Sequence, residues 1–180
     1  MKTQREIYKL ANTFVTVIGS KPVLLDDIGT LIDNLRRISS KVSVQAIDAN
    51  VVYGIEHLIE VLKITLEASR RGILVAKNPE TDLLLRVTYT NQISLALKYG
   101  GLKNNANCCF VILAKDKKEL SKVSCHIYRS FRVDDSVLRP NAQKRKKISR
   151  IIGITGGPAL FDDDFDFTSF IIENASLIQR

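Results

Sequence analysis

The sequence predicts an α+β fold: a single domain over residues 1–180 in which a small, mixed and mostly antiparallel sheet packs with several helices. Helical patterns dominate the chain, while three short stretches have the alternation or the continuous apolar run of β-strands. The helical stretches between these strands are uneven, unlike the regular strand–helix alternation of parallel α/β folds. A chain of 180 residues is also the usual size of one domain with one core.

The first 50 residues predict two strands with a helix between them. Residues 14–19, FVTVIG, alternate β-branched and aromatic side chains up to a glycine, as strands do. Residues 24–38 repeat apolar side chains at helical spacing, with aspartates early and arginines late, which suits the helix dipole. Residues 41–49, KVSVQAIDA, alternate again and predict the second strand.

Three helices are predicted in the middle of the chain. The longest covers residues 54–71, where two arginines and a following glycine mark its end. Asn78 is a favourable N-cap for the next helix, and Pro79 suits the first helical position. Thr90 caps a third helix. The buried stripe of that third helix is predicted to consist of Ile93, Ala96 and Leu97.

The remainder of the chain predicts a central strand and three further helices. Residues 107–113, NCCFVIL, are continuously apolar, as expected of a strand that is buried on both faces. Helical patterns follow at 116–128, 145–154 and 165–178. The acidic run at 162–166 directly precedes the last helix, and we interpret it as N-terminal capping in preference to a cation site.

No arrangement of residues indicates catalysis, a metal site or a bound cofactor, and we expect none of the three. Cys109, Cys125 and His126 lack the spacing of zinc ligands, so we interpret them as core thiols and a surface histidine. The glycine-rich residues 153–158, GITGGP, lack the GK[ST] ending of a phosphate-binding loop. We interpret them as a helix stop and turn.

Nothing in the sequence indicates secretion or insertion into a membrane. The first ten residues are charged, and no apolar run approaches the roughly 18 residues that a membrane-spanning helix needs. Three cysteines form no even disulfide framework. We therefore expect reduced thiols in a cytoplasmic protein with no membrane partner.

Residues 83–115 contain no acidic side chain, although they include several basic and amide ones. Two interpretations are open: the stretch is simply buried, or its polar side chains face RNA, whose phosphates repel carboxylates. Lys77 belongs to the same neighbourhood, and the N-terminus of the helix after Asn78 is a natural phosphate seat. Tyr89 could stack on a base, but a lone aromatic more often packs internally.

A second basic cluster lies at 139–150, and residues 139–147 of it are the only linker-like piece of the chain. The cluster consists of Arg139, Lys144, Arg145, Lys146, Lys147 and Arg150. Such a charge run is either a solvated face or an electrostatic contact for nucleic acid. The net charge of +8 is compatible with both interpretations.

Four stretches of the chain resemble a known family. They are QAIDANVVYGIEHLIEV at 45–61, NPETDLLLRVTYTNQISLALKYGGL at 78–102, DDSVL at 134–138 and SFIIENASLI at 169–178. In this order they are similar to the small, kinase-binding subunit of the KEOPS complex, the TPRKB-like family. The resemblance covers about residues 12–180.

The resemblance implies a non-catalytic subunit that binds the kinase-like KEOPS subunit and, through it, the other subunits. KEOPS makes threonylcarbamoyl-adenosine in tRNA, and archaeal members of the family hold the single-stranded CCA end of the tRNA. The RNA-binding role is carried over to Asn78, Arg86 and Gln92, which lie in the matching block. Lys77 and Lys98 are added on charge alone.

Two further questions are left open by the sequence. At the corner between the two helices the family often has a small residue and glycine, whereas this chain has Thr88 and Tyr89. A bulkier corner changes the shape of any nucleotide pocket. The chain could therefore instead stabilise a kinase partner without binding RNA. An enzyme of unknown type is the least favoured alternative. The last helix has more apolar positions than one face needs, so Phe170 and Ile171 are candidate partner-binding residues, unless this helix closes the core.

Overall fold

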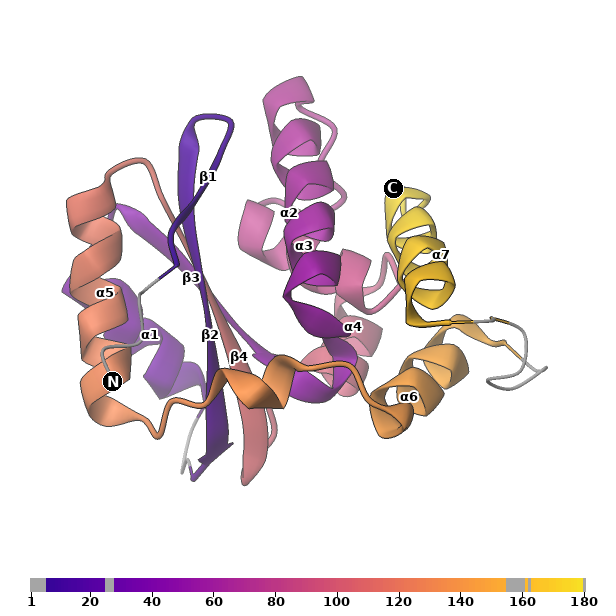
Figure 1. Cartoon of the computed structure of the whole chain (residues 1–180). Helices are drawn as coiled ribbons and strands as arrows, with labels where there is room; N and C mark the ends of the chain where they lie inside the picture. The colour runs from indigo at the N-terminus through magenta and orange to yellow at the C-terminus, as the bar shows by residue number, and fades with distance from the viewer. Residues whose placement is uncertain (1–5, 25–27, 155–160, 162, 180) are drawn as a thin grey trace. The chain divides into compact units, whose positions relative to one another are not determined.

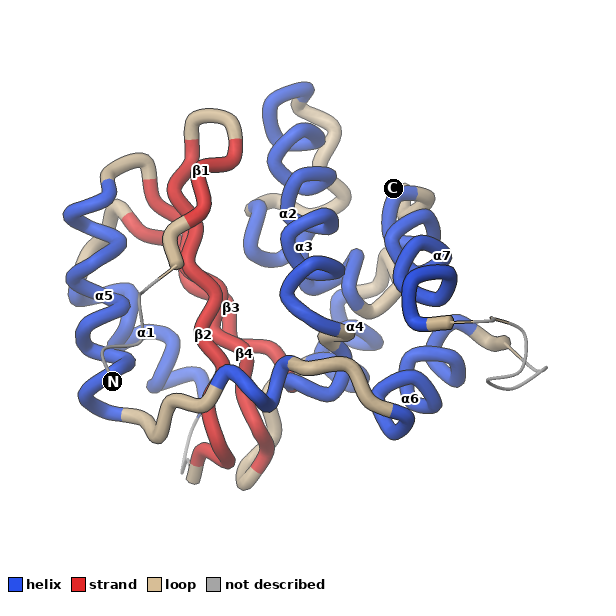
Figure 2. The backbone as a smooth tube through the Cα atoms, viewed as in Figure 1, coloured by secondary structure: helices blue, strands red, loops and turns tan. Residues whose placement is uncertain are grey.

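A computed structural model describes residues 6–24, 28–154, 161 and 163–179 of the chain (Figure 1). Helices and a four-stranded sheet make up the fold, which confirms the α+β class (Figure 2). The chain divides into two compact units, and each is described by itself. The sheet unit comprises residues 1–47 and 102–137, and the helical unit comprises 48–101 and 138–180. The single domain over residues 1–180 stays a prediction.

The sheet of the first unit has the strand order β1-β2-β4-β3. Its strands are β1 (Tyr8–Leu10), β2 (Thr13–Val23), β3 (Val42–Asp48) and β4 (Ala106–Ala114). The pairings β1–β2 and β2–β4 are both antiparallel, as predicted for most of the sheet. β1 was not predicted, because its three residues are too few to show an alternating pattern.

Two helices cover one face of this sheet, α1 (Ile28–Ile38) and α5 (Lys117–Ser130) (Figure 2). A short 3₁₀ turn, η2 (Asp135–Leu138), follows α5. The core between helices and sheet is apolar and includes Ile18, Leu35, Val44, Phe110 and Leu120, all with no exposed surface. β4 is buried along most of its length, in agreement with its continuous apolar sequence.

The second unit is helical. It contains residues 83–101 of the stretch that has no acidic side chain. Its elements are η1 (Ala49–Val51), α2 (Gly54–Arg71), α3 (Pro79–Val87), α4 (Ile93–Gly100), α6 (Ala142–Ile152) and α7 (Asp164–Ser176). Its aromatic cluster is built from Tyr53, Ile148, Phe167 and Ile171. The rings of Tyr53 and Phe167 meet edge to face, with centroids 4.8 Å apart.

The ends of these helices follow local sequence signals. α2 ends where Gly72 adopts the left-handed conformation, with φ of 70°. α6 ends in the same way at Gly153. This agrees with the helix stop that was predicted at the start of the glycine-rich residues 153–158, of which 155–158 lie outside the described residues. Asp163 caps α7 by accepting a hydrogen bond of 2.8 Å from the backbone N–H of Asp166, which confirms capping by the acidic run.

The segment predicted to be linker-like is instead mostly helix. α6 begins at Ala142 because the Asn141 side chain accepts a hydrogen bond of 2.9 Å from the backbone N–H of Lys144. This N-cap starts the helix before the basic run. No helix within the described ranges is long and apolar enough to cross a bilayer.

Candidate nucleic-acid and partner interface

α3 starts at the predicted position, and the two residues that precede it are exposed. Asn78 occupies the N-cap position in an extended backbone conformation, and Pro79 is the first helical residue. The Asn78 side chain makes no capping hydrogen bond, so its amide remains available to a partner. Lys77 is also exposed. A cation and an amide therefore lie exposed directly before α3, whose first turn contains the buried carboxylates of Glu80 and Asp82.

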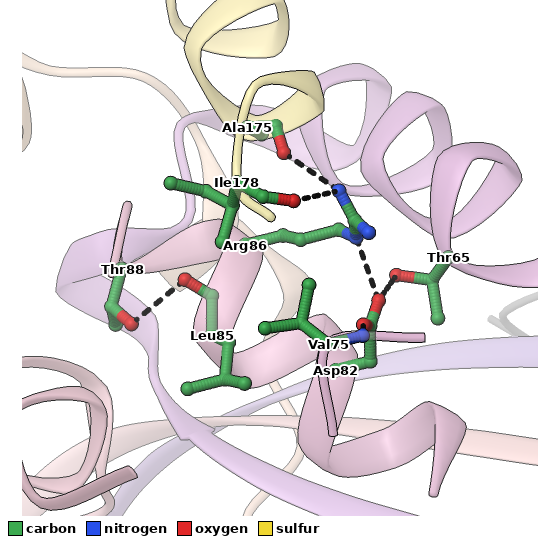
Figure 3. Close-up of polar contacts among 8 residues, drawn as sticks. All are labelled: Thr65, Val75, Asp82, Leu85, Arg86, Thr88, Ala175 and Ile178. Atoms are coloured by element: carbon green, nitrogen blue, oxygen red, sulfur yellow. Dashed lines mark hydrogen bonds and ion pairs between the residues drawn. The ribbon is translucent and has the colours of Figure 1, made fainter. Parts of the chain in front are cut away.

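α3 itself is buried along most of its length and carries Asp82 in the interior. Asp82 has no exposed surface. Its Oδ2 accepts a hydrogen bond of 3.1 Å from Thr65 Oγ1 of α2, and its Oδ1 accepts one of 2.7 Å from the backbone N–H of Val75 (Figure 3). Asp82 thus ties α2, the loop after it and α3 together.

Arg86 lies one turn further along α3 and points into the protein, with a relative exposure of 4%. Its Nε donates to Asp82 Oδ2 over 2.6 Å. Its Nη1 donates to the backbone oxygens of Ala175, at 3.0 Å, and Ile178, at 3.4 Å, at the end of α7 (Figure 3). The prediction that Arg86 contacts RNA is wrong, because its guanidinium holds the end of α7 and is paired with a buried carboxylate.

The corner after α3 is formed by buried side chains. Thr88 Oγ1 donates to the backbone oxygen of Leu84 over 2.7 Å, and Tyr89 adopts a positive φ of 54°. Gly100 approaches the corner so closely that a Cβ there would lie 2.5 Å from Thr88 Cγ2. Only glycine fits at position 100, so the end of α4 leaves room for the bulkier residues of the corner.

Tyr89 packs against the aromatic cluster, which confirms internal packing as its role. Its hydroxyl lies 3.3 Å from Nε2 of the fully buried His57. The Nδ1 of His57 accepts a hydrogen bond of 3.2 Å from the backbone N–H of Tyr53, so the ring is neutral. Burial, with a further contribution from the Lys144 ammonium, lowers the pKa of His57 to about 3.

α4 turns a largely uncharged face to solvent. Thr90 Oγ1 accepts a hydrogen bond of 3.1 Å from the backbone N–H of Gln92, and the helix begins at Ile93. Ala96 is buried, but Ile93 and Leu97 are more than half exposed, so their assignment to a buried stripe is wrong. An eight-residue helix that packs through Ala96 and Gly100 leaves its other side chains outside.

Four of the five predicted RNA-binding residues are exposed, but they form two groups. Gln92 and Lys98 belong to α4, whereas Lys77 and Asn78 precede α3. The nine residues of α3 and the corner after it stand between the two groups in the chain, and no hydrogen bond or ion pair of the described residues joins one group to the other.

The second basic cluster is largely used inside the helical unit. The Nζ of Lys144 is buried and donates to the backbone oxygen of Val52 over 2.8 Å. Lys147 pairs at 2.6 Å with Asp48, which also caps η1. Arg145 donates to the backbone oxygen of Phe161 over 3.0 Å. Three cations of the cluster therefore have partners within the protein, so the cluster is not simply a solvated face. Arg139, Lys146 and Arg150 are exposed, and contact with nucleic acid through them stays a prediction.

α7 closes the core of the helical unit. Ile171 has no exposed surface, so its predicted role in binding a partner is wrong. Phe170 is partly buried, with its ring 4.9 Å from that of Phe161, and its role stays a prediction. The strongly exposed large apolar side chains at this end of the chain are instead Phe165 in the first turn of α7 and Leu177 directly after it. Others are Ile73 after α2 and Ile93 and Leu97 on α4. The sequence did not reveal these positions, because nothing in the pattern distinguishes them from core residues.

Among the residues that the structure describes, no group of three or more His, Cys, Asp or Glu side chains could hold a metal ion. Cys108 and Cys109 are buried in β4, and Cys125 of α5 is half-buried. None of the described side chains thus offers a constellation with which to build a metal-dependent reaction. What the helical unit does offer is exposed amide, basic and apolar side chains around α3 and α4.

Comparison with known proteins identifies the family of the chain. The family model described as "Kinase binding protein CGI-121" matches residues 25–177. No curated protein matches the chain. The family match confirms the resemblance to the small kinase-binding subunit and covers both compact units. The chain therefore belongs to the CGI-121 family of kinase-binding proteins.

Proposed function

We propose that this chain is a non-catalytic, cytoplasmic subunit of a KEOPS complex, which makes threonylcarbamoyl-adenosine in tRNA. It binds the kinase-like subunit, as its family does, and recruits tRNA through the single-stranded CCA end. Family membership supports the kinase-binding part of this proposal. The RNA-binding part rests on the exposed residues around α3 and α4.

One observation carries the RNA-binding part: α4 and the turn before it expose only uncharged and basic side chains. The exposed positions are Asn91, Gln92, Ile93, Ser94, Leu97 and Lys98. A phosphate chain that lies here meets no carboxylate, and amide side chains can reach base edges. Lys77 and Asn78, which are also exposed, offer the same chemistry just before the start of α3.

Charge reversal on α4 tests this surface. We expect Lys98→Glu to weaken tRNA binding by about five- to tenfold and to reduce the salt dependence by about one ion, because one phosphate contact is lost. Lys118→Glu on α5 is the matched control, since Lys118 is exposed and the change in net charge is the same. Gel-shift titrations at two salt concentrations measure both. Equal weakening by the two variants would show that only the net charge matters.

Removal of the CCA end tests which part of the tRNA is bound. We expect tRNA that lacks these three nucleotides to bind the wild-type chain more weakly, by about tenfold, since unstacked bases are the part that side chains can read. Lys98→Glu should then bind intact and trimmed tRNA with similar affinity. If the wild-type chain does not distinguish intact from trimmed tRNA, recruitment through the CCA end is wrong.

A second candidate function is support of the kinase partner without RNA binding. The interior position of Arg86 favours it, because the one cation that both sequence and resemblance assigned to RNA is paired with Asp82 and holds the end of α7 through its Nε and Nη1. The same titrations separate the two functions. A chain without RNA binding should bind tRNA no more tightly than an unrelated protein of net charge +8.

A further inference from the structure

The helical unit contains a cleft of about 740 Å³ that neither the sequence nor the family description assigns to a ligand. It is formed by the second half of α2, the start of the following loop and the end of α7. Its apolar walls are Ile64, Ala68, Ile73 and Ile178. Ile73 has a relative exposure of 60%, which is unusual for an isoleucine next to a concave surface.

A buried cation lines the same cleft. Nε and Nη1 of Arg86 are used by Asp82 and by the end of α7, as described above. A guanidinium has five N–H donors, and within the described chain no hydrogen bond is formed by the two on Nη2 (Figure 3). Arg86 lines the cleft, and its Nη2 is not among the buried side-chain atoms that lack a partner. The cleft therefore combines apolar walls with two N–H groups that a bound acceptor can engage.

The rim of the cleft carries both signs of charge, from Lys63, Arg71 and Glu67. Glu67 pairs with Arg70 and Arg71, at 2.7 and 2.6 Å, and their hydrogen bonds lower its pKa to about 2. Because Glu67 is balanced in this way and Lys63 adds a cation, the rim accepts an anionic group. No aromatic side chain of the described chain lines the cleft, so a base would find no ring on which to stack.

We propose that this cleft is the docking site for a peptide segment of the kinase partner that carries a carboxylate next to a large apolar side chain. The carboxylate accepts the two N–H groups of Arg86 Nη2, and the apolar side chain packs against Ile73 and Ile178. A carboxylate fits because charge-assisted hydrogen bonds to a guanidinium are short and strong. This kinase-docking cleft, as we call it, is distinct from the surface on α4.

The test uses the full-length chain and its kinase partner, with affinity measured by titration calorimetry. Ile73→Asp places a carboxylate on the wall where the apolar side chain should pack, and we expect it to weaken kinase binding at least about tenfold. Because Ile73 is mostly exposed, the variant should keep the wild-type melting temperature within about 2 °C.

Leu97→Asp is the matched control, since Leu97 has a similar exposure of 54% but lies on α4. It should change kinase affinity less than about twofold. Wild-type kinase affinity in Ile73→Asp, or equal weakening by both variants, would overturn the proposal. Loss of tRNA binding in Ile73→Asp would also overturn it, because the cleft would then belong to RNA.

Hydrogen exchange supplies a measurement that needs no substitution. Binding of the kinase partner should slow amide exchange in the loop at 72–76, which borders the cleft, and leave residues 93–98 of α4 unchanged. Slower exchange confined to α4 would contradict the kinase-docking cleft. Failure of the tRNA experiments would leave this result unaffected, because kinase binding does not depend on RNA.

Discussion

Replacing Asp82 by alanine is expected to lower the free energy of unfolding by about 3–5 kcal/mol. The substitution leaves the Arg86 guanidinium buried without its carboxylate and removes the acceptor of Thr65 and of the Val75 backbone. Breaking a buried pair costs more than the pair contributes, because the remaining charge is not solvated. Urea denaturation followed by circular dichroism measures the loss.

A control and a double substitution separate the charge from the packing. Glu67→Ala removes two exposed ion pairs of α2, with Arg70 and Arg71, and should leave the urea midpoint nearly unchanged. Adding Arg86→Met to Asp82→Ala should recover part of the lost stability, because no buried charge then remains. A double variant that is no more stable than Asp82→Ala alone would contradict this explanation. For the same reason, Arg86→Glu is a test of folding and cannot report on tRNA binding.

Acid should destabilise the protein through His57, by about 2–3 kcal/mol at pH 4.5. The folded-state pKa of about 3 lies below the ordinary value of 6.5, so the unfolded chain binds a proton first as the pH falls. The contribution of His57 is therefore fully present above pH 6.5 and is lost progressively between pH 6.5 and about 3. Protonation would place an N–H on Nδ1, directly facing the backbone N–H of Tyr53.

The pH dependence can be assigned by comparing two histidine variants. His57→Gln is expected to be less stable at neutral pH but to show a shallower loss of stability between pH 6.5 and 4.5 than the wild-type chain. His126→Gln, which changes the exposed histidine of α5, should follow the wild-type curve. Urea denaturation at intervals of half a pH unit gives the curves. Parallel curves for wild type and His57→Gln would show that the acid sensitivity comes from other groups.

The helices and strands were largely predictable, because their signals are local. The helix at 54–71 was predicted with the bounds that the structure shows, since its apolar stripe and its glycine stop lie within one continuous stretch. The capping of α7 by the acidic run was predicted for the same reason. The start of α6 was missed because a single asparagine cap outweighed a composition that is typical of linkers.

The positions of individual side chains within the candidate surfaces were less predictable. Ile93 and Ile171 both lie in helical apolar patterns, but only Ile171 is buried. The difference depends on which neighbouring helix covers each position, and that neighbour is distant in the sequence. The kinase-docking cleft could not be predicted for the same reason, because its walls come from α2 and from residues about a hundred positions later in the chain.

The sequence by itself determined the family, the α+β class and most element boundaries, because these depend on residue order and periodicity along the chain. It also contained Asp82 and Arg86 at a spacing of one helical turn, which is a signal of an ion pair. This signal was missed because attention went to the stretch without acidic residues that begins just after Asp82. Only the tertiary structure decided that Arg86 faces inward and Lys98 outward. Burial is decided by the packing of α7 and α2 around α3, and the charge of a residue does not reveal which neighbours will surround it.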